Sequence, residues 1–376
     1  MARSAARSAH VVPAARDGYD PVTLDLSGLR EPFSMTDPPP QAEIRAIAAS
    51  FPDGVLTNAD LDREHPEWNL ALIAERLGVR QRRIAADGET TLDLGHRACE
   101  RLFAEHPELP GLVDAIIFCT QSADYILPPN ATVLHGRLGL PERVAAFDIN
   151  LACSGFIYSL QIAWSMIRAS SARHVLVVAG DTYSKYIHKA DRSARALFGD
   201  GAAATWIAPA ERGPRIRSIM CGTSGRDFAA FIIPAGACRQ PHSAATRVEH
   251  VDESGNVRCA ENIHMAGRKL LDFMGVTIPR HVREFLKRNE LTPGEIDLYV
   301  FHQASGVVLD SLRTELDLPA ERVFTNLRDI GNTVSASIPI ALRDAQAAGR
   351  LRPGDRVLLC GFGVGLSWGS ALLDIP

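Results

Sequence analysis

Residues 147–167 carry the pattern that decides the fold, reading Phe147-Asp-Ile-Asn-Leu-Ala-Cys153-Ser-Gly155-Phe-Ile-Tyr-Ser-Leu-Gln-Ile-Ala-Trp-Ser-Met-Ile167. The stretch begins as a β-rich run and passes through small residues at 152–155. Larger apolar residues then recur at the spacing of a helix, namely Phe156, Leu160, Ala163, Trp164 and Ile167. The pattern therefore predicts a strand, a tight turn and a helix, with Cys153 on the turn.

Cys153 is a candidate nucleophile because of this position. The first backbone N–H groups of a helix and the positive end of its dipole favour a thiolate, which is the reactive form of cysteine. The alternative is a buried cysteine that serves as a small apolar side chain. The local pattern alone leaves both interpretations open.

The rest of the chain alternates β-rich runs with helical stretches from about residue 41, which predicts an α/β architecture with buried, largely parallel strands. A duplication is visible within it. Residues 113–122 can be laid on 296–305 at a spacing of 183 residues, and 175–180 on 357–361 at a spacing of 182. Two pairs in one order predict two related halves, 41–210 and 211–376, with the functional site at their junction.

Composition excludes several classes of protein. Of 376 residues, 46% are hydrophobic and 22% are charged, as in ordinary globular proteins. A net charge of −4 provides no global basic field for nucleic acid. The apolar runs are strand-sized and shorter than the roughly 18 residues of a membrane helix. We therefore expect a soluble protein with neither nucleic acid nor membrane as a partner.

Seven scattered cysteines without a C-x-x-C pair predict neither a disulfide framework nor a zinc site, so no metal is expected and a cytoplasmic location fits best. The first residues are rich in Arg, Ser and Ala but lack the apolar core of a secretory signal. We interpret residues 1–40, which end in three prolines, as a mobile N-terminal tail.

Two downstream segments strengthen the interpretation of Cys153 as a nucleophile. His302 stands where an apolar strand ends, and Asn332 lies in a Gly-led turn before a small-residue helix. A thiol, an imidazole and a neutral amide form a set suited to thioester chemistry. The order Cys, His, Asn also occurs in papain-like proteases, but Leu151-Ala-Cys-Ser-Gly155 lacks the sequence context that those enzymes need.

The chain from about residue 42 resembles the β-ketoacyl-ACP synthase III branch of the thiolase-like condensing enzymes. The motifs that carry this resemblance occur in the order of the family and are Asp148-Ile-Asn-Leu-Ala-Cys-Ser-Gly155, Asp191-Arg192, Leu197-Phe-Gly-Asp-Gly-Ala202, Met265-Ala-Gly267, His302-Gln-Ala304, Gly331-Asn-Thr333, Ala336-Ser-Ile-Pro339 and Gly361-Phe-Gly-Val-Gly-Leu-Ser-Trp-Gly369. The resemblance implies a thiolase-like fold in which two duplicated α/β halves form a layered α-β-α-β-α core.

The resemblance also implies the reaction and its residues. Cys153 takes an acyl group from a thioester, while His302 and Asn332 hydrogen-bond the malonyl thioester carbonyl as carbon dioxide leaves. The backbone N–H groups of Cys153 and Val364 polarise the acyl-enzyme carbonyl. No cofactor is implied, because coenzyme A or phosphopantetheine thioesters are the substrates, and the implied partners are an acyl carrier protein and a second copy of the chain.

Further positions match family residues that contact substrate. The implied substrate-binding set is Trp68, Arg76, Leu127, Arg192, Gly267, Arg268 and Ala304. Trp68 and Arg76 would clasp coenzyme A, although the stretch that holds them is about four residues longer than usual. Leu127, in a segment that crosses the dimer interface in the family, stands where an aromatic side chain often lies. Val307 replaces a common arginine, and Val364 replaces a common glycine.

We expect a condensing enzyme that joins an acyl group to malonyl-ACP and releases 3-oxoacyl-ACP, in fatty-acid or specialised-metabolite synthesis. One alternative is acyl transfer from Cys153 to a hydroxyl or amine, or non-decarboxylative joining of two acyl chains. Another is a non-catalytic partner subunit, in which the nucleophile would be absent. The presence of Cys153 argues against the latter.

Overall fold

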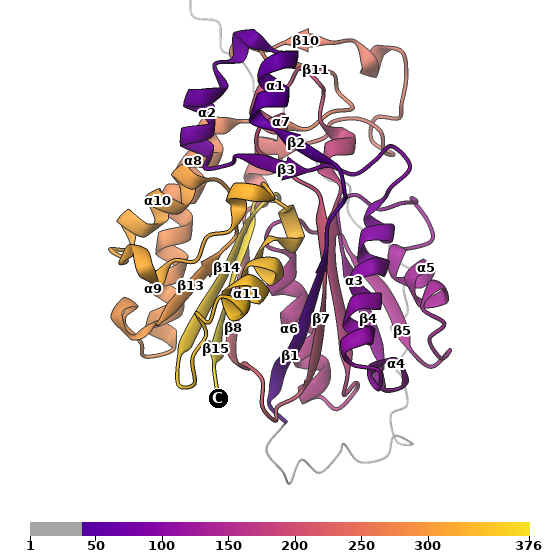
Figure 1. Ribbon diagram of the computed structural model, residues 1–376, viewed down its shortest axis with the longest axis vertical. Helices are drawn as coiled ribbons and strands as arrows, with labels where there is room; N and C mark the ends of the chain where they lie inside the picture. Colours follow the sequence, from indigo (N-terminus) through magenta and orange to yellow (C-terminus); the bar gives the residue numbers. More distant parts are fainter. Residues whose placement is uncertain (1–39) are drawn as a thin grey trace, which may run out of the picture. The chain divides into compact units, whose positions relative to one another are not determined.

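One nine-stranded sheet organises the computed structural model, which describes residues 40–376 (Figure 1). The strands lie in the order β13-β14-β15-β8-β1-β7-β6-β4-β5. Their bounds are β1 Ala42–Ser50, β4 Ala115–Cys119, β5 Ala145–Ile149, β6 Val175–Asp181, β7 Gly201–Pro209, β8 Arg215–Thr223, β13 Leu298–Phe301, β14 Arg356–Gly363 and β15 Ser367–Asp374. The predicted tail lies outside the described residues, apart from Pro40.

The two pairs of similar sequences form strands with equivalent places in the sheet. Residues 113–122 contain β4 and residues 296–305 contain β13, while the second pair forms β6 and β14. In each half the first strand is parallel to the second, and the second is antiparallel to its next neighbour, β7 or β15. The halves join in the middle, where β1 pairs with β8. The boundary at residue 210 stays a prediction.

Antiparallel pairs outnumber parallel ones in this sheet, so the expectation of largely parallel strands is wrong. Only β4 with β5, β4 with β6, and β13 with β14 are parallel. The chain turns directly from β14 into β15 without a crossover helix, and such a connection produces an antiparallel pair. The runs are nevertheless apolar throughout, because helices cover both faces of the strands.

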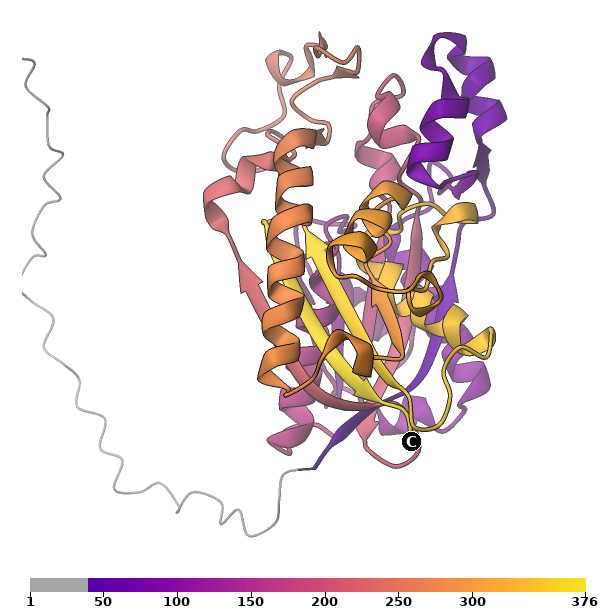
Figure 2. The ribbon, with the colours of Figure 1, turned by 90° about the vertical axis from the view of Figure 1, so that its left-hand side faces the viewer.

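The two halves of the sheet lie on either side of a central helix layer, and further helices cover each half from outside. This gives the predicted α-β-α-β-α arrangement. Helices α6 (Gly155–Arg168) and α11 (Ser337–Ala347) contact strands of both halves and form the central layer. Helices α3 (Thr91–Glu105) and α5 (Asn130–Arg137) cover the first half. Helices α9 (Ile278–Arg288) and α10 (Gly306–Glu315) lie over the second half, where α9 runs across β15 (Figure 2).

The remaining elements surround the ends of the strands. They are β2 Val55–Thr57, α1 Asn58–Glu64, α2 Leu70–Leu77, β3 Gln81–Arg83, α4 Leu109–Leu112, α7 Arg192–Arg195, β9 Phe231–Ile232, β10 His250–Val251, β11 Val257–Arg258, β12 His264–Met265 and α8 Gly267–Asp272. Within residues 40–376 no helix has both the length and the apolar character needed to span a bilayer.

Candidate active site

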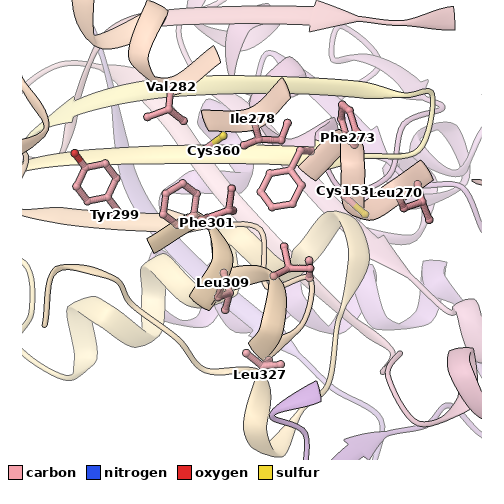
Figure 3. Packing of buried hydrophobic residues seen from close by; sticks show 14 of the residues in the cluster. Cys153, Leu270, Phe273, Ile278, Val282, Tyr299, Phe301, Leu309, Leu327 and Cys360 are labelled. Atoms are coloured by element: carbon pink, nitrogen blue, oxygen red, sulfur yellow. The ribbon is translucent and has the colours of Figure 1, made fainter. Parts of the chain in front are cut away.

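Cys153 lies on the turn between β5 and α6, as the sequence pattern predicted. The end of β14 passes directly over this turn. A Cβ atom on Gly363 would lie 2.8 Å from the Cys153 sulfur, and one on Gly361 would lie 2.8 Å from the Cys153 carbonyl oxygen. Both distances are below van der Waals contact, so glycine is required for this approach. The thiol is consequently buried at the edge of the apolar cluster beneath α9 (Figure 3).

The free thiol is protonated at neutral pH, contrary to the expectation that the helix start favours thiolate. Burial raises the pKa of Cys153 to about 12, and the nearby carboxylate of Asp181 adds to this rise. The backbone N–H groups of Cys153 and Val364 face the sulfur and oppose the shift, but they do not outweigh desolvation. The pattern indicated the turn but not the strand that covers it.

His302 follows β13, and its imidazole is buried beside Phe362, with ring centroids 5.6 Å apart. Burial lowers the pKa of His302 to about 3, so the ring is neutral at physiological pH. Its Nδ1 lies 2.6 Å from the Ser337 hydroxyl at the start of α11. When that hydroxyl donates to Nδ1, the remaining proton resides on Nε2 and makes it a hydrogen-bond donor.

Asn332 lies in the loop before α11, and its amide orientation follows from its neighbours. The side-chain Oδ1 accepts a hydrogen bond of 2.9 Å from the Val334 N–H. The opposite end, Nδ2, donates to the Ala304 carbonyl at 3.2 Å and lies 3.5 Å from His302 Nε2. Two N–H donors therefore converge, and β14 links them to the nucleophile because Phe362 contacts His302 while Gly363 covers Cys153.

Two buried serines support the turn that carries Val364. The Ser367 hydroxyl donates to the Val364 carbonyl at 2.6 Å. The Ser154 hydroxyl lies 2.7 Å from the Ser367 hydroxyl. Because Ser154 is adjacent to Cys153, this chain joins the nucleophile turn to the turn whose N–H faces the sulfur. Both serines lie within the family motifs, but their contact spans 213 residues and has no local sequence signal.

Asp181 ends β6 beside the site and was also missed. Its carboxylate accepts hydrogen bonds from Gln121 N–H at 2.8 Å and from the Ser335 hydroxyl at 2.6 Å, so it ties the two halves together. Burial raises the pKa of Asp181 to about 6 despite these donors. A carboxyl group at the end of the fully apolar run 175–180 was the signal that could have identified it.

The predicted coenzyme A residues are only partly accessible. Trp68 is 5% exposed and stacks on His65 with ring centroids 3.9 Å apart, so an adenine base would have to displace this imidazole. Arg76 is exposed in the last turn of α2. Arg192 begins α7 and donates to the Ser254 carbonyl at 3.1 Å.

The other predicted substrate contacts lie in three places. Ala304 touches the donor pair directly, through the Asn332 hydrogen bond. Gly267 and Arg268 are exposed at the start of α8. Leu127 is 80% exposed in the loop before α5.

The layered fold and the convergence of a thiol with two N–H donors define a thiolase-like acyltransferase. The chain belongs to the 3-oxoacyl-[acyl-carrier-protein] synthase III family. The sequence model of this family matches residues 147–225, and the model of its C-terminal part matches residues 286–375.

Individual relatives agree with this assignment. The β-ketoacyl-[acyl-carrier-protein] synthase III of Campylobacter curvus is 35% identical over 89% of this chain and 96% of its own length. The crystal structure of the Thermus thermophilus enzyme is 36% identical, covers 88% of this chain and 98% of its own, and superposes with a TM-score of 0.78. A priming β-ketosynthase from the R1128 polyketide pathway is 29% identical, covers 93% and 100%, and has a TM-score of 0.77.

Proposed function

We propose that this enzyme transfers an acyl group from a thioester to Cys153 and joins it to malonyl-ACP, releasing carbon dioxide and 3-oxoacyl-ACP. The observation that carries this proposal is the pair of neutral donors, His302 Nε2 and Asn332 Nδ2, which lie 3.5 Å apart. Decarboxylation of a malonyl thioester places negative charge on the thioester oxygen, and two preorganised donors stabilise that charge. The family relationship supports the same reaction in fatty-acid or polyketide synthesis.

In the first half-reaction, the Cys153 sulfur forms a bond to the acyl carbon of the donor. The bond from that carbon to the donor sulfur breaks, and the thiol proton leaves with the donor thiol. The N–H groups of Cys153 and Val364 face this sulfur and can bind the oxyanion of the tetrahedral intermediate. No metal or cofactor takes part in this scheme.

In the second half-reaction, the malonyl C–C bond breaks and its electron pair forms an enolate, whose oxygen His302 and Asn332 hold. The enolate carbon then attacks the acyl carbon on Cys153. The new C–C bond displaces the Cys153 thiolate, which regains a proton from solvent. Intact-protein mass spectrometry with acyl donors, followed by detection of 3-oxoacyl-ACP after addition of malonyl-ACP, tests both halves. Acylation without any 3-oxoacyl product would favour acyl transfer to another acceptor.

Gly363→Ala is expected to lower the rate of Cys153 acylation by about 100-fold or more, because a methyl group at 2.8 Å from the sulfur fills the space that the acyl group needs. Stopped-flow acylation or timed mass spectrometry measures this rate. Gly136→Ala is the control for a Gly-to-Ala change elsewhere, since Gly136 lies in α5 with open space around its Cα, and its acylation rate should stay within a factor of two. Normal acylation of Gly363→Ala would contradict the geometry.

We propose that the acyl donor is a carrier protein rather than coenzyme A. His65 covers one face of Trp68, and Val307 provides no cation at a position where the family commonly has arginine. Helices α8 and α9, by contrast, carry exposed basic residues that could bind a carrier protein, namely Arg268, Lys269, Arg280 and Arg283. Such a surface attracts an acidic carrier protein through interactions that weaken with salt.

Acyl-ACP is therefore expected to acylate Cys153 with a higher kcat/KM than the matching acyl-CoA, by about tenfold at low salt. The combined change Arg268→Glu and Lys269→Glu should remove this preference. Measuring both donors at low and high salt provides the check. Equal use of acyl-CoA that is insensitive to these changes would reject the carrier-protein proposal.

We also propose a homodimer in which the loop with Tyr125, Ile126 and Leu127 covers the partner's acyl site. Ile126 is 95% exposed and Leu127 is 80% exposed, which is unusual for adjacent apolar side chains unless another surface covers them. Sedimentation velocity of the wild type and of Ile126→Asp tests this assembly. A monomeric wild type would reject it.

A further inference from the structure

A cavity of about 780 Å³ lies beside Val364, the residue after the Gly363 that covers the nucleophile. Val364, whose N–H faces the Cys153 sulfur, forms part of its wall together with Tyr183 and Gln121. Tyr183 and Cys153 also belong to one buried apolar cluster, against which Val364 packs. An acyl group bound to Cys153 would therefore enter this cavity past Tyr183.

The wall that contains Tyr183 combines an aromatic surface with a hydrogen-bonding pair. The ring of Tyr183 packs against Phe198 and Phe231, with centroids 5.4 and 6.3 Å away. Its hydroxyl, by contrast, donates to Gln121 Oε1 at 2.9 Å. The ring is thus fixed by apolar contacts, while its oxygen and the Gln121 amide form a polar pair in the lining of the cavity.

Gln121 itself is held in place by its backbone. Its N–H donates to Asp181 at 2.8 Å, so the strand end at β6 sets its position. Because Oε1 accepts from Tyr183, the Nε2 end of the amide points elsewhere, and no acceptor for it lies within hydrogen-bond distance among residues 40–376. Nε2 and the lone pairs of the phenol oxygen can therefore bind a hydroxyl or oxo group of a ligand.

The charged residues of the cavity are already paired. Glu261 accepts from Thr246 at 2.6 Å and lies 3.0 Å from His242 Nδ1, while Lys185 donates to the Asp87 carbonyl at 3.1 Å. The other polar side chains of the wall are neutral, and among them Tyr183 and Gln121 are joined by a hydrogen bond. The cavity consequently fits an uncharged oxygen substituent better than a carboxylate.

We propose that Tyr183 and Gln121 select an acyl group with a neutral oxygen substituent, a hydroxyl or oxo group, near its thioester. This inference rests on the proposed function, because it requires an acyl group on Cys153. A plain alkanoyl chain offers Gln121 Nε2 no acceptor, whereas a hydroxyl or oxo group provides one.

The test compares acylation of Cys153 by pantetheine thioesters, so that neither coenzyme A nor carrier-protein contacts enter. The probes are butyryl, 2-hydroxybutyryl, 3-hydroxybutyryl and succinyl pantetheine, followed by intact-protein mass spectrometry. We expect at least one hydroxybutyryl probe to react about tenfold faster than butyryl, the scale of one hydrogen bond, and succinyl to react more slowly than both.

The variants Tyr183→Phe and Gln121→Leu should bring the hydroxybutyryl-to-butyryl ratio close to one. The matched control is Tyr299→Phe on β13, which removes a hydroxyl that donates to the Pro293 carbonyl away from the cavity. That variant should keep the wild-type ratio. Thermal unfolding of each variant confirms that it remains folded.

The outcomes separate this inference from the proposed function. Acylation by none of these probes and by no acyl-ACP would count against the proposed function itself. Efficient acylation with butyryl equal to or better than both hydroxybutyryl probes, or with succinyl the best probe, would overturn only the selection proposed for Tyr183 and Gln121. A hydroxybutyryl preference that survives both substitutions would overturn it as well.

Discussion

Cys153→Ala is expected to abolish acyl-enzyme formation and to lower condensation by about 10,000-fold or more, which is the scale observed when a catalytic nucleophile is removed. Cys153 is the thiol that lies on the strand-to-helix turn, with two N–H groups facing its sulfur. Alanine removes the sulfur and leaves those donors in place. Intact-protein mass spectrometry after exposure to an acyl thioester should detect no added mass.

Cys119→Ala is the matched control, because this thiol is also buried and lies on the other side of the same turn. Its sulfur occupies the space where a Cβ on Gly155 would fall, and it donates to the Leu151 carbonyl at 3.2 Å. Burial raises the pKa of Cys119 well above its ordinary value, and the Ser159 hydroxyl and the Leu151 backbone oppose that rise only in part. Acylation should persist in this variant, and labelling that followed Cys119 instead would refute the assignment of Cys153.

The fold was predictable from sequence because its signals are local and repeated. The apolar runs at 113–122 and 175–180 form β4 and β6, and their counterparts form β13 and β14 at equivalent positions. The strand directions were not predictable in the same way. Whether β15 runs parallel or antiparallel to β14 depends on a three-residue connection rather than on the apolar pattern of either strand.

The site was predictable only in part, since several of its properties arise from contacts between distant segments. The motifs identified Cys153, His302 and Asn332, and the structure brings the last two within 3.5 Å. The raised pKa of Cys153 depends on burial, to which the close approach of Gly363 contributes, and the orientation of His302 depends on Ser337 at the start of another helix. Neither contact can be predicted from the residues adjacent to Cys153 or His302 in the sequence.

His302→Ala and Asn332→Ala are each expected to lower malonyl-ACP decarboxylation by about 100-fold, the effect of losing one oxyanion donor. Self-acylation of Cys153 should remain within a few-fold of wild type, because its oxyanion is held by the Cys153 and Val364 N–H groups instead. Release of carbon dioxide from malonyl-ACP and the mass added by an acyl donor measure the two half-reactions separately. Equal loss of both in either variant would show that the assigned division of labour is wrong.

The pH dependence of decarboxylation distinguishes a neutral His302 donor from a charged one. Since burial lowers the pKa of His302 to about 3, the ring stays neutral between pH 8 and pH 6. The factor lost in His302→Ala should therefore be the same at both pH values, whereas an imidazolium with an ordinary pKa near 6.5 would contribute more at pH 6.

Ser337→Ala tests the orientation of the His302 donor, because it removes the hydroxyl at 2.6 Å that directs the ring proton to Nε2. That variant should lose about tenfold in decarboxylation while keeping wild-type acylation, and a Ser337→Thr variant should recover most of the rate.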